Sequence, residues 1–267
     1  MGLLQATEGS RMLETLGIVD ACFESSAELS RITRQVGGKS VLEWVVRRAT
    51  EAQQLDGVIV LARDASQKET IKRHVPLDVP LYATSADDVL GCWAETTAEF
   101  PCRAVVRIPP FSPLLDPTLL DRLVVEASAH RAEASDYIGF MLKCGKPATL
   151  SASPVFGEWF RSKAIHKAAR SARGKKYRND PTLYILSRPK QFRLMWLPCP
   201  TEIDREDVRL TFEGDEDREH IEVIFDVLGP DCDWHRVVEL LDCSPSLRKQ
   251  MADLNRKKAA ENVAEKR

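Results

Sequence analysis

The sequence lacks several features that would assign it at once to a class of protein. Its cysteines form no CxxC pair and no zinc-type spacing; they lie at positions 22, 92, 102, 144, 199, 232 and 243. No stretch reaches the ~18 uncharged apolar residues that a membrane span needs. The N-terminus MGLLQATEGSRMLE has no apolar signal-peptide core. Scattered thiols are typical of a reducing compartment, so the sequence predicts a cytoplasmic protein.

A large net charge is also absent. The chain carries 38 basic and 40 acidic residues, a formal net charge of −2, which excludes a general electrostatic attraction to nucleic acid or to an anionic membrane. Basic residues nevertheless cluster in 161–178 and 248–267. The 267 residues, 43% hydrophobic and 29% charged, predict one larger globular domain, or one with a small appendage.

The common catalytic motifs are missing as well. GGKS (37–40) resembles the end of a phosphate-binding loop, but Thr33 stands where that motif needs glycine, so a tight turn before a helix is favoured. There is no GxGxxG and no GxSxG motif. The histidines (74, 130, 166, 220, 235) show no metal-ligand spacing. His74 and His130 lie near the ends of predicted helices, where we expect a surface position.

Two charged runs leave a binding role open. EGDEDREH (213–220) could hold a cation through oxygen ligands, but acids also stabilise the first turn of a helix, and this capping role is favoured. RSKAIHKAARSARGKKYR (161–178) could grip phosphates, whereas a solvated helix face more often explains such spacing.

Apolar runs alternate with amphipathic stretches through the first half. We expect strands at 17–22, 57–63, 80–84 and 103–108. Helices are expected after GGKS, with Val41, Leu42, Val45 and Val46 on one face, and at 67–75, 87–100 and 117–133. Asp87 or Ser85 can cap the third of these helices, and Pro117 suits the first turn of the last. This rhythm predicts a mostly parallel sheet with helices on both faces.

After residue 136 the pattern loosens. Strands are expected at 136–142, 191–198 and 208–212, and a basic helix within 154–176. Helices are expected at 218–228 and 233–242, followed by a charged helical tail that frays beyond Leu254.

Five stretches of the sequence can be compared with the motifs of a known family: GGKSVLEWVVRRA (37–49), DDVLGCW (87–93), VRIPPFSPLLDP (106–117), PTLYILSRPKQFRL (181–194) and VRLTFEGDEDREHIEVIFDVLG (208–229). In order and spacing they resemble GGKPLLEWVIERL, DDVLGRY, VRITGDCPLIDP, TPYI followed by FRL, and LRLTVDTPEDLELIRAIFEALG. These elements are those of the cytidylyltransferases of spore-coat and surface polysaccharide biosynthesis, relatives of the CMP-sialic acid and CMP-Kdo synthetases. The resemblance runs from about Gly17 to Lys258.

The resemblance implies an α/β nucleotidyltransferase fold, Rossmann-like and of the glycosyltransferase-A type. Such enzymes are usually homodimers that join CTP to a sugar and release pyrophosphate, with Mg²⁺ neutralising charge at the α-phosphate. It also implies an N-terminal extension (1–16), a cytidylyltransferase-like domain (17–229) and a C-terminal helical extension with a charged tail (230–267). Residues 136–200 would form the sugar-side and dimerisation region.

In the nucleotide loop that the resemblance implies, most of the residues that would bind a nucleotide are replaced. The family's ARMGSTRLPGK corresponds to ACFESSAELSR at 21–31. Glu24 replaces a glycine and puts a negative charge where triphosphate oxygens would lie. The positions equivalent to the nucleotide loop are Cys22 and Ala27, which replace arginines, together with Ser25, Arg31 and Lys39.

The metal positions differ in the same way. Phe111 stands at the place of a metal-binding aspartate and cannot coordinate Mg²⁺. Glu213 stands for the second aspartate, and Asp180 for a histidine of the family. The family's sugar-side carboxylates are missing from 148–155. The remaining candidates are Asp87, Asp88 and Arg107 on the base and ribose side, and Thr182 and Tyr184 on the sugar side.

Three interpretations remain open. The concentrated losses favour a non-catalytic relative, without cofactors, that binds or regulates in surface-glycan synthesis. The alternative is a divergent but active transferase that uses CTP and Mg²⁺ and recruits the metal through Glu213. In a third interpretation, a smaller anion binds to Arg31, Lys39, Arg107 and the basic segment 161–178. Expected partners are a second copy, a nucleotide or sugar, and glycan-biosynthesis enzymes, but neither nucleic acid nor a membrane.

Overall fold

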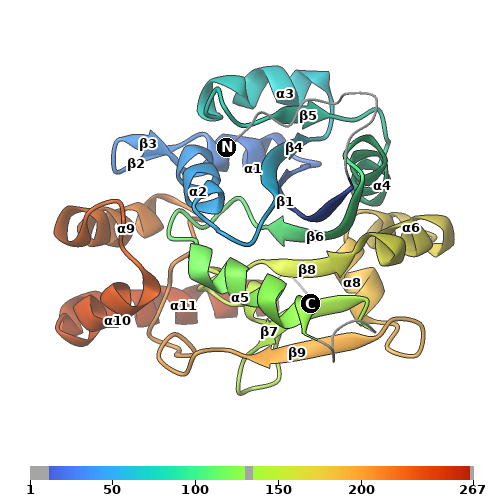
Figure 1. The fold of residues 1–267 in the computed structure, drawn as a ribbon. Coiled ribbons are helices and arrows are strands. Elements are labelled where there is room, and N and C mark those ends of the chain that lie inside the picture. Colours follow the sequence, from blue (N-terminus) through green and yellow to red (C-terminus); the bar gives the residue numbers. More distant parts are fainter. Residues whose placement is uncertain (1–11, 130–134, 265–267) are drawn as a thin grey trace.

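A seven-stranded sheet runs through the centre of the molecule (Figure 1). The computed structural model describes residues 12–129 and 135–264. The strands of the sheet, in spatial order, are β5 (Leu81–Ala83), β4 (Gly57–Ala62), β1 (Leu13–Ala21), β6 (Cys102–Ile108), β8 (Glu158–Arg161), β7 (Tyr137–Met141) and β9 (Leu194–Pro198). Only β8 runs antiparallel to its neighbours, so the predicted mostly parallel α/β sheet is confirmed.

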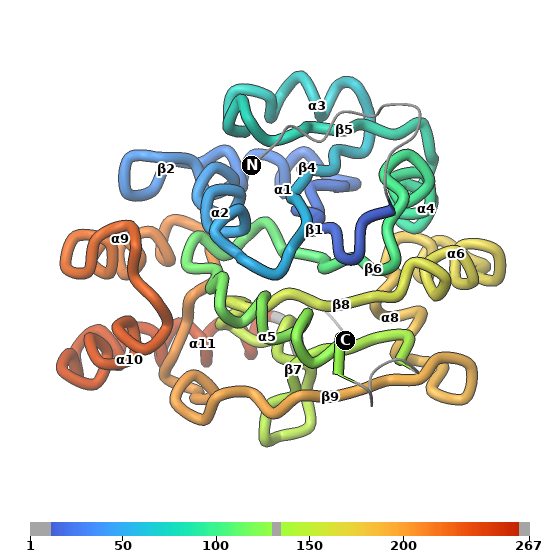
Figure 2. The backbone as a smooth tube through the Cα atoms, in the orientation of Figure 1, coloured from blue at the N-terminus to red at the C-terminus, as the bar shows by residue number. Residues whose placement is uncertain are grey.

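Helices cover both faces of the sheet, as predicted. They are α1 (Ser26–Ile32), α2 (Val41–Thr50), α3 (Ala65–Ile71), α4 (Val89–Glu99), α5 (Pro117–Ser128), α6 (Ser162–Ser171), α7 (Lys175–Arg178), α8 (Pro181–Leu186), α9 (Asp215–Leu228), α10 (Trp234–Asp242) and α11 (Pro245–Ala264), with short 3₁₀ turns at Lys72–His74 and Ala148–Leu150. The helices α9 to α11 gather on one side, beside α2 and β2 (Gln35–Val36) (Figure 2). In the described ranges, no helix is both long and apolar enough to cross a membrane.

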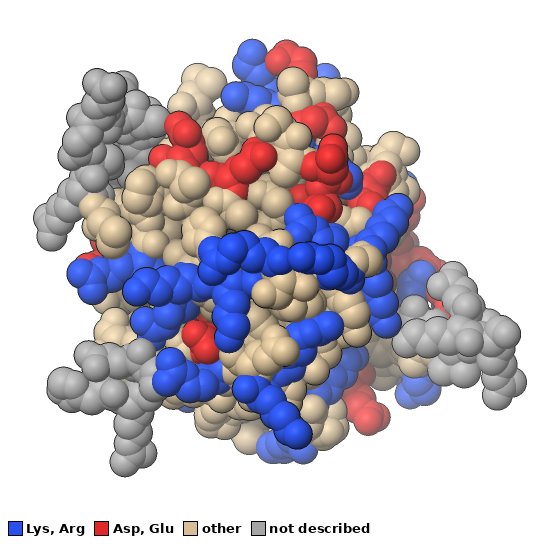
Figure 3. Space-filling view, turned by 90° about the vertical axis from the view of Figure 1, so that its right-hand side faces the viewer, with Lys and Arg blue, Asp and Glu red and all other residues tan. Residues whose placement is uncertain are grey.

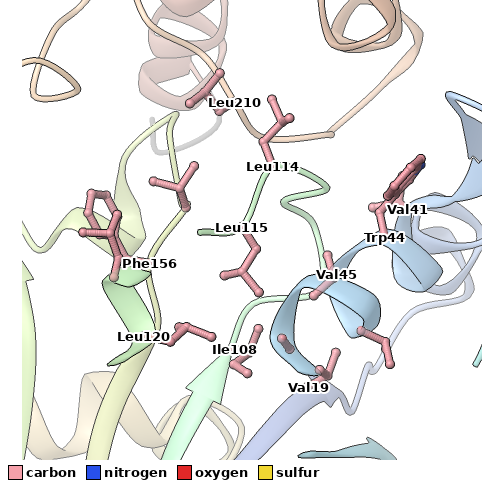
Figure 4. Close-up of a cluster of buried hydrophobic side chains, with 14 of the residues drawn as sticks. Val19, Val41, Trp44, Val45, Ile108, Leu114, Leu115, Leu120, Phe156 and Leu210 are labelled. Atoms are coloured by element: carbon pink, nitrogen blue, oxygen red, sulfur yellow. The ribbon is translucent and has the colours of Figure 1, made fainter. Parts of the chain in front are cut away.

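The central strand β1 feeds two separate cores because its side chains alternate between the two faces. Val19 and Ala21 enter the core under α2 and α5, part of which is shown in Figure 4. Leu16 and Ile18 enter the core under α4, α6 and α8. This strand begins at Leu13, four residues before the predicted start, because Leu13 already pairs with Cys102 on β6.

Other predictions need correction. Residues 208–212 are buried but form no strand; Leu210 and Thr211 donate their amides to the Ala152 carbonyl, in an irregular segment. Residues 158–161 form strand β8 ahead of the expected basic helix, which begins at Ser162. The cap of α4 is Asp88, not Asp87 or Ser85.

The two helix-terminal histidines were expected at the surface. His74 is buried, at 9% exposure, so the prediction is wrong for this residue. His130 lies outside the described residues.

The predicted tight turn at GGKS is confirmed. Strands β2 and β3 (Lys39–Ser40) form an antiparallel ribbon, and Gly37 and Gly38 between them have φ values of 54° and 81°. Both conformations favour glycine. A Cβ atom on Gly37 would lie 2.8 Å from a Phe225 ring carbon, whereas one on Gly38 would meet nothing within 4 Å.

We therefore expect Gly37→Ala to lower the free energy of unfolding by about 2–4 kcal/mol, through backbone strain and overpacking. Gly38→Ala, which adds only backbone strain, should cost about 1–2 kcal/mol. Urea unfolding of both variants measures the difference. Equal losses of unfolding free energy in the two variants would show that the Phe225 ring moves aside at no measurable cost.

Candidate functional site

The candidate site lies where the carboxyl ends of the parallel strands β1, β4 and β6 meet, the usual ligand position in such sheets. The loop after β1 brings Phe23 and Glu24 to this edge, and the loop after β6 brings Phe111. The rings of Phe23 and Phe111 lie 5.4 Å apart, so these two loops are in contact. Residues before α8 close the edge from the other half of the chain, through Asn179.

Glu24 occupies the centre of a group of donors. Its Oε1 accepts from Asn179 Nδ2 at 2.6 Å, and lies 3.3 Å from Lys175 Nζ and 3.8 Å from Arg63 Nη1. A carboxylate of this chain is thus the anion held by these groups. Arg63 was not among the predicted site residues, and Lys175 was predicted only as part of the basic segment 161–178; the fold brings both cations to the loop.

Beyond Ser25, the nucleotide-loop equivalent forms helix α1. Ser25 caps α1, accepting from the Glu28 amide at 3.3 Å and donating to the Glu28 carboxylate at 2.9 Å. Ala27 lies in the first turn of this helix. Cys22 is buried, and a hydrogen bond with Cys92, together with burial, raises the pKa of its thiol well above the ordinary value. None of these side chains is arranged to receive a phosphate.

Phe111 fills the position of the expected metal ligand with a ring. The Arg31 guanidinium lies over this ring, 5.2 Å from its centroid. The basic group that the loop retains therefore makes a cation–π contact with an aromatic side chain. Lys39 does not join it: its Nζ lies 4.7 Å from the Trp44 ring centroid, and it lines a separate hollow with Arg47 and Pro230.

An ionic network lies beneath the loops. Arg107 donates from Nε to Asp20 at 2.9 Å and from Nη1 to Glu158 at 3.0 Å. Glu158 also accepts from Thr182 at 3.0 Å and from Tyr137 at 2.8 Å. Burial opposes the charge of Arg107, but Asp20 and Glu158 outweigh it and raise its pKa. Arg107 and Thr182, predicted as ligand-facing residues, are hence joined in one network that ties the four strands β1, β6, β7 and β8 together.

Sequence reasoning missed the two carboxylates of this network. Asp20 is a charged residue inside an otherwise apolar strand, and it is only 4% exposed. That isolated charge was the available signal, because a buried carboxylate needs a partner. Glu158 offered no such signal, since its strand was not predicted.

The other sugar and ribose candidates have structural roles. Asp88 caps α4 and pairs with Arg178 Nε at 2.7 Å, while Asp87 gives only its backbone carbonyl to Arg63. Asp180 caps α8, accepting from Leu183 N at 2.8 Å. Tyr184 is buried between other aromatic rings and under Arg188.

The two metal-position equivalents do lie side by side. The Phe212 amide donates to the Phe111 carbonyl at 2.8 Å, which places Glu213 next to the loop after β6. Glu213 is paired with Arg209 at 2.9 Å. With a phenyl ring at one position and an ion-paired carboxylate at the other, this donor set does not fit Mg²⁺. Within 12–129 and 135–264, no group of three or more His, Cys, Asp or Glu side chains could hold a metal ion.

The acidic run at 213–220 caps a helix, as predicted. Asp217 accepts from the backbone amides of Glu213 and Gly214 at 2.7 and 3.1 Å, at the start of α9. It also binds Arg209 Nε at 2.6 Å, in a pair whose side chains are each 2% exposed. These carboxylates therefore serve the fold at this point.

The buried His220 next to this pair predicts a pH dependence of stability. Burial lowers its pKa to about 4, against the attraction of Asp217, whose Oδ1 lies 3.8 Å from Nε2. Because the unfolded chain binds a proton near pH 6.5 and the folded chain does not, stability is fully present above pH ~6.5 and is lost as the pH falls towards 4. The loss should reach about 3 kcal/mol.

Urea unfolding of the native chain and of a His220→Asn variant between pH 4 and 7 measures this effect. The native chain should lose more stability on acidification than the variant. Parallel pH profiles would contradict the assignment to His220.

Comparisons with known proteins agree with this architecture. A family model described as cytidylyltransferase matches residues 29–258. The spore coat polysaccharide biosynthesis protein SpsF of Bacillus subtilis is 24% identical over 242 residues, covering 88% of this chain and 96% of that protein.

Solved structures show the same fold. A cytidylyltransferase from Leptospira borgpetersenii superposes with a TM-score of 0.72 at 18% identity, over 89% of this chain and 97% of that one. A CMP-Kdo synthetase in complex with CTP gives a TM-score of 0.53 at 10% identity, over 70% and 90% of the two chains. Taken with the match to the family model, which spans most of the sequence, these likenesses show that the chain belongs to the cytidylyltransferase family.

Proposed function

We propose that this protein is a non-catalytic cytidylyltransferase-like protein with a binding or regulatory role in surface-polysaccharide biosynthesis. The observation that carries the proposal is the Glu24 carboxylate, held by Asn179, Lys175 and Arg63 at the edge of the sheet where CTP would bind. A triphosphate would have to displace this anion and would be repelled by it.

Two further observations support the same conclusion. Phe111 brings no metal ligand to its loop, and Arg31 lies over its ring. Glu213 is paired with Arg209, which also holds the buried Asp217. Without a metal at these positions, and with Lys175 and Arg63 held by Glu24, charge developing at an α-phosphate would not be stabilised.

A second candidate function is a divergent but active transferase that joins CTP to a sugar with Mg²⁺. What favours it is Glu213, whose side chain is 41% exposed next to the loop after β6. A conformational change that released Arg209 would free this carboxylate for a metal.

A pyrophosphate-release assay separates the two. Purified protein, CTP, Mg²⁺ and a panel of sugar acids are expected to give no release above the protein-free background. A CMP-Kdo synthetase assayed in parallel is the positive control. Steady release that scales with the concentration of this protein would overturn the non-catalytic role.

The proposal includes a homodimer, and a cytoplasmic location beside other enzymes of glycan synthesis. Light scattering of the purified chain, 30.0 kDa as a monomer, tests the dimer directly. A mass near that of one chain at micromolar concentration would remove this part of the proposal.

A further inference from the structure

One side of the molecule carries a dense band of basic side chains (Figure 3). Residues 161–193 hold eleven Lys and Arg residues and one acid, Asp180, in a chain whose net charge is −2. We call the exposed cations of this segment the basic face: Lys163, Lys167, Arg170, Arg173, Lys175, Lys176, Lys190 and Arg193. Such a concentration of one charge is self-repulsive unless an anion meets it.

The basic face is built on packed elements. Helix α6 buries Ala164, Ile165 and Ala168 against the sheet, so that Lys163, Lys167 and Arg170 lie together on the outer side, at positions i, i+4 and i+7. Lys167 Nζ donates to the Gln191 carbonyl at 2.6 Å, which joins α6 to the segment before β9. The cations are thereby held as one surface.

Internal acids neutralise only part of this surface. Lys175 pairs with Glu24, and Arg193 lies 3.9 Å from Asp136. For Lys163, Arg170 and Lys176 the described residues provide no side-chain hydrogen bond or ion pair. These three side chains are therefore available to an outside ligand.

The side chains of the basic face limit the kinds of ligand that can bind to it. No large hydrophobic side chain between 161 and 193 is among the exposed ones of the described residues. Membrane insertion and the apolar centre of a protein interface both need such side chains. Tyr177 and Tyr184 are covered by the Arg188 guanidinium, at 4.4 and 3.8 Å, so neither ring offers a stacking platform for a nucleic-acid base.

We propose that the basic face binds an acidic polysaccharide, a flexible chain whose carboxylates or phosphates pair with the cations. The face continues to the candidate site, because Lys175 contacts Glu24 and Arg178 contacts Asp88. This inference deepens the binding role proposed above and rests on it for the choice of a glycan. Its test measures glycan binding alone, so its failure is distinct from that of the CTP predictions.

The experiment is a titration of immobilised polygalacturonate with the purified full chain, at low and at physiological ionic strength. The native chain should bind polygalacturonate, and this binding should weaken as salt screens the charges. The variant Lys163→Glu/Arg170→Glu/Lys176→Glu should bind about a hundredfold more weakly, since each cation near an anionic surface contributes roughly a factor of five.

The matched control is Lys68→Glu/Lys146→Glu/Lys249→Glu, which changes net charge equally at exposed lysines outside the face. It should retain binding within about threefold. If the reversal variant does not fold, the neutral variant K163Q/R170Q/K176Q replaces it, with about a tenfold loss expected.

Dextran, single-stranded DNA and vesicles containing anionic lipid are the competing probes. Equal binding of dextran, equal losses in the control variant, or tighter binding of DNA or vesicles than of polygalacturonate would overturn the proposal. The proposal would be established if the native chain binds polygalacturonate more tightly than the other probes and only the basic-face variant loses this binding.

Discussion

The Glu24→Gln variant is expected to bind CTP about tenfold to a hundredfold more tightly than the native chain, which brings a binding too weak to detect at millimolar CTP into the measurable range. In the native chain the carboxylate holds Asn179, Lys175 and Arg63. Glutamine keeps the shape but removes the charge, so the two cations become available and a repulsion of about 1–3 kcal/mol with an incoming triphosphate disappears. Isothermal titration calorimetry with CTP measures the change.

Glu28→Gln is the matched control, since Glu28 is a half-buried acid of the same loop and helix. It should leave CTP binding undetectable at millimolar CTP, as in the native chain. Adding Phe111→Asp to Glu24→Gln should make the binding depend on Mg²⁺, because the loop then carries an oxygen ligand. Unchanged CTP affinity in Glu24→Gln would mean that the carboxylate does not block the site.

The Arg209→Met variant is expected to lose about 3–5 kcal/mol of unfolding free energy, because it leaves the buried Asp217 without its cation. Both side chains of this pair are 2% exposed and joined at 2.6 Å. The expected loss is a large part of the stability of an ordinary domain. Urea unfolding, with the slope of the transition compared between variants, provides the measurement.

The same arginine supplies the control. Glu213, its second partner, is 41% exposed, so Glu213→Gln should cost less than about 1 kcal/mol. A comparable loss in both variants would show that burial does not set the strength of this network. No loss in Arg209→Met would show that Asp217 is satisfied by the backbone amides alone.

The strands that the sequence predicted well are those with continuous apolar runs. Residues 57–63 and 103–108 became β4 and β6 within one residue at each end. The run at 208–212 holds three apolar residues in five and is buried, but its backbone bonds to the loops at Ala152 and Phe111. Apolar composition reports burial, and only the partners of the backbone decide whether a buried run is a strand.

The positions of the candidate site were predicted from the sequence, but its contacts were not. Motif order predicted that Glu24, Phe111 and Glu213 belong to one site, and the structure brings their loops together. That these positions have lost the binding of nucleotide and metal stays a prediction. The contact between Glu24 and Asn179 joins residues 155 positions apart. Such a long-range pair leaves no local pattern, so the cations around Glu24 became visible only in the folded chain.

We propose that the nucleotide site of this cytidylyltransferase-family protein is closed by its own side chains. The most direct test is a calorimetric titration of the native chain with CTP, with and without Mg²⁺. We expect no detectable heat at millimolar CTP under either condition. Magnesium-dependent binding at micromolar strength would contradict it, and would identify an active nucleotide site behind Glu24.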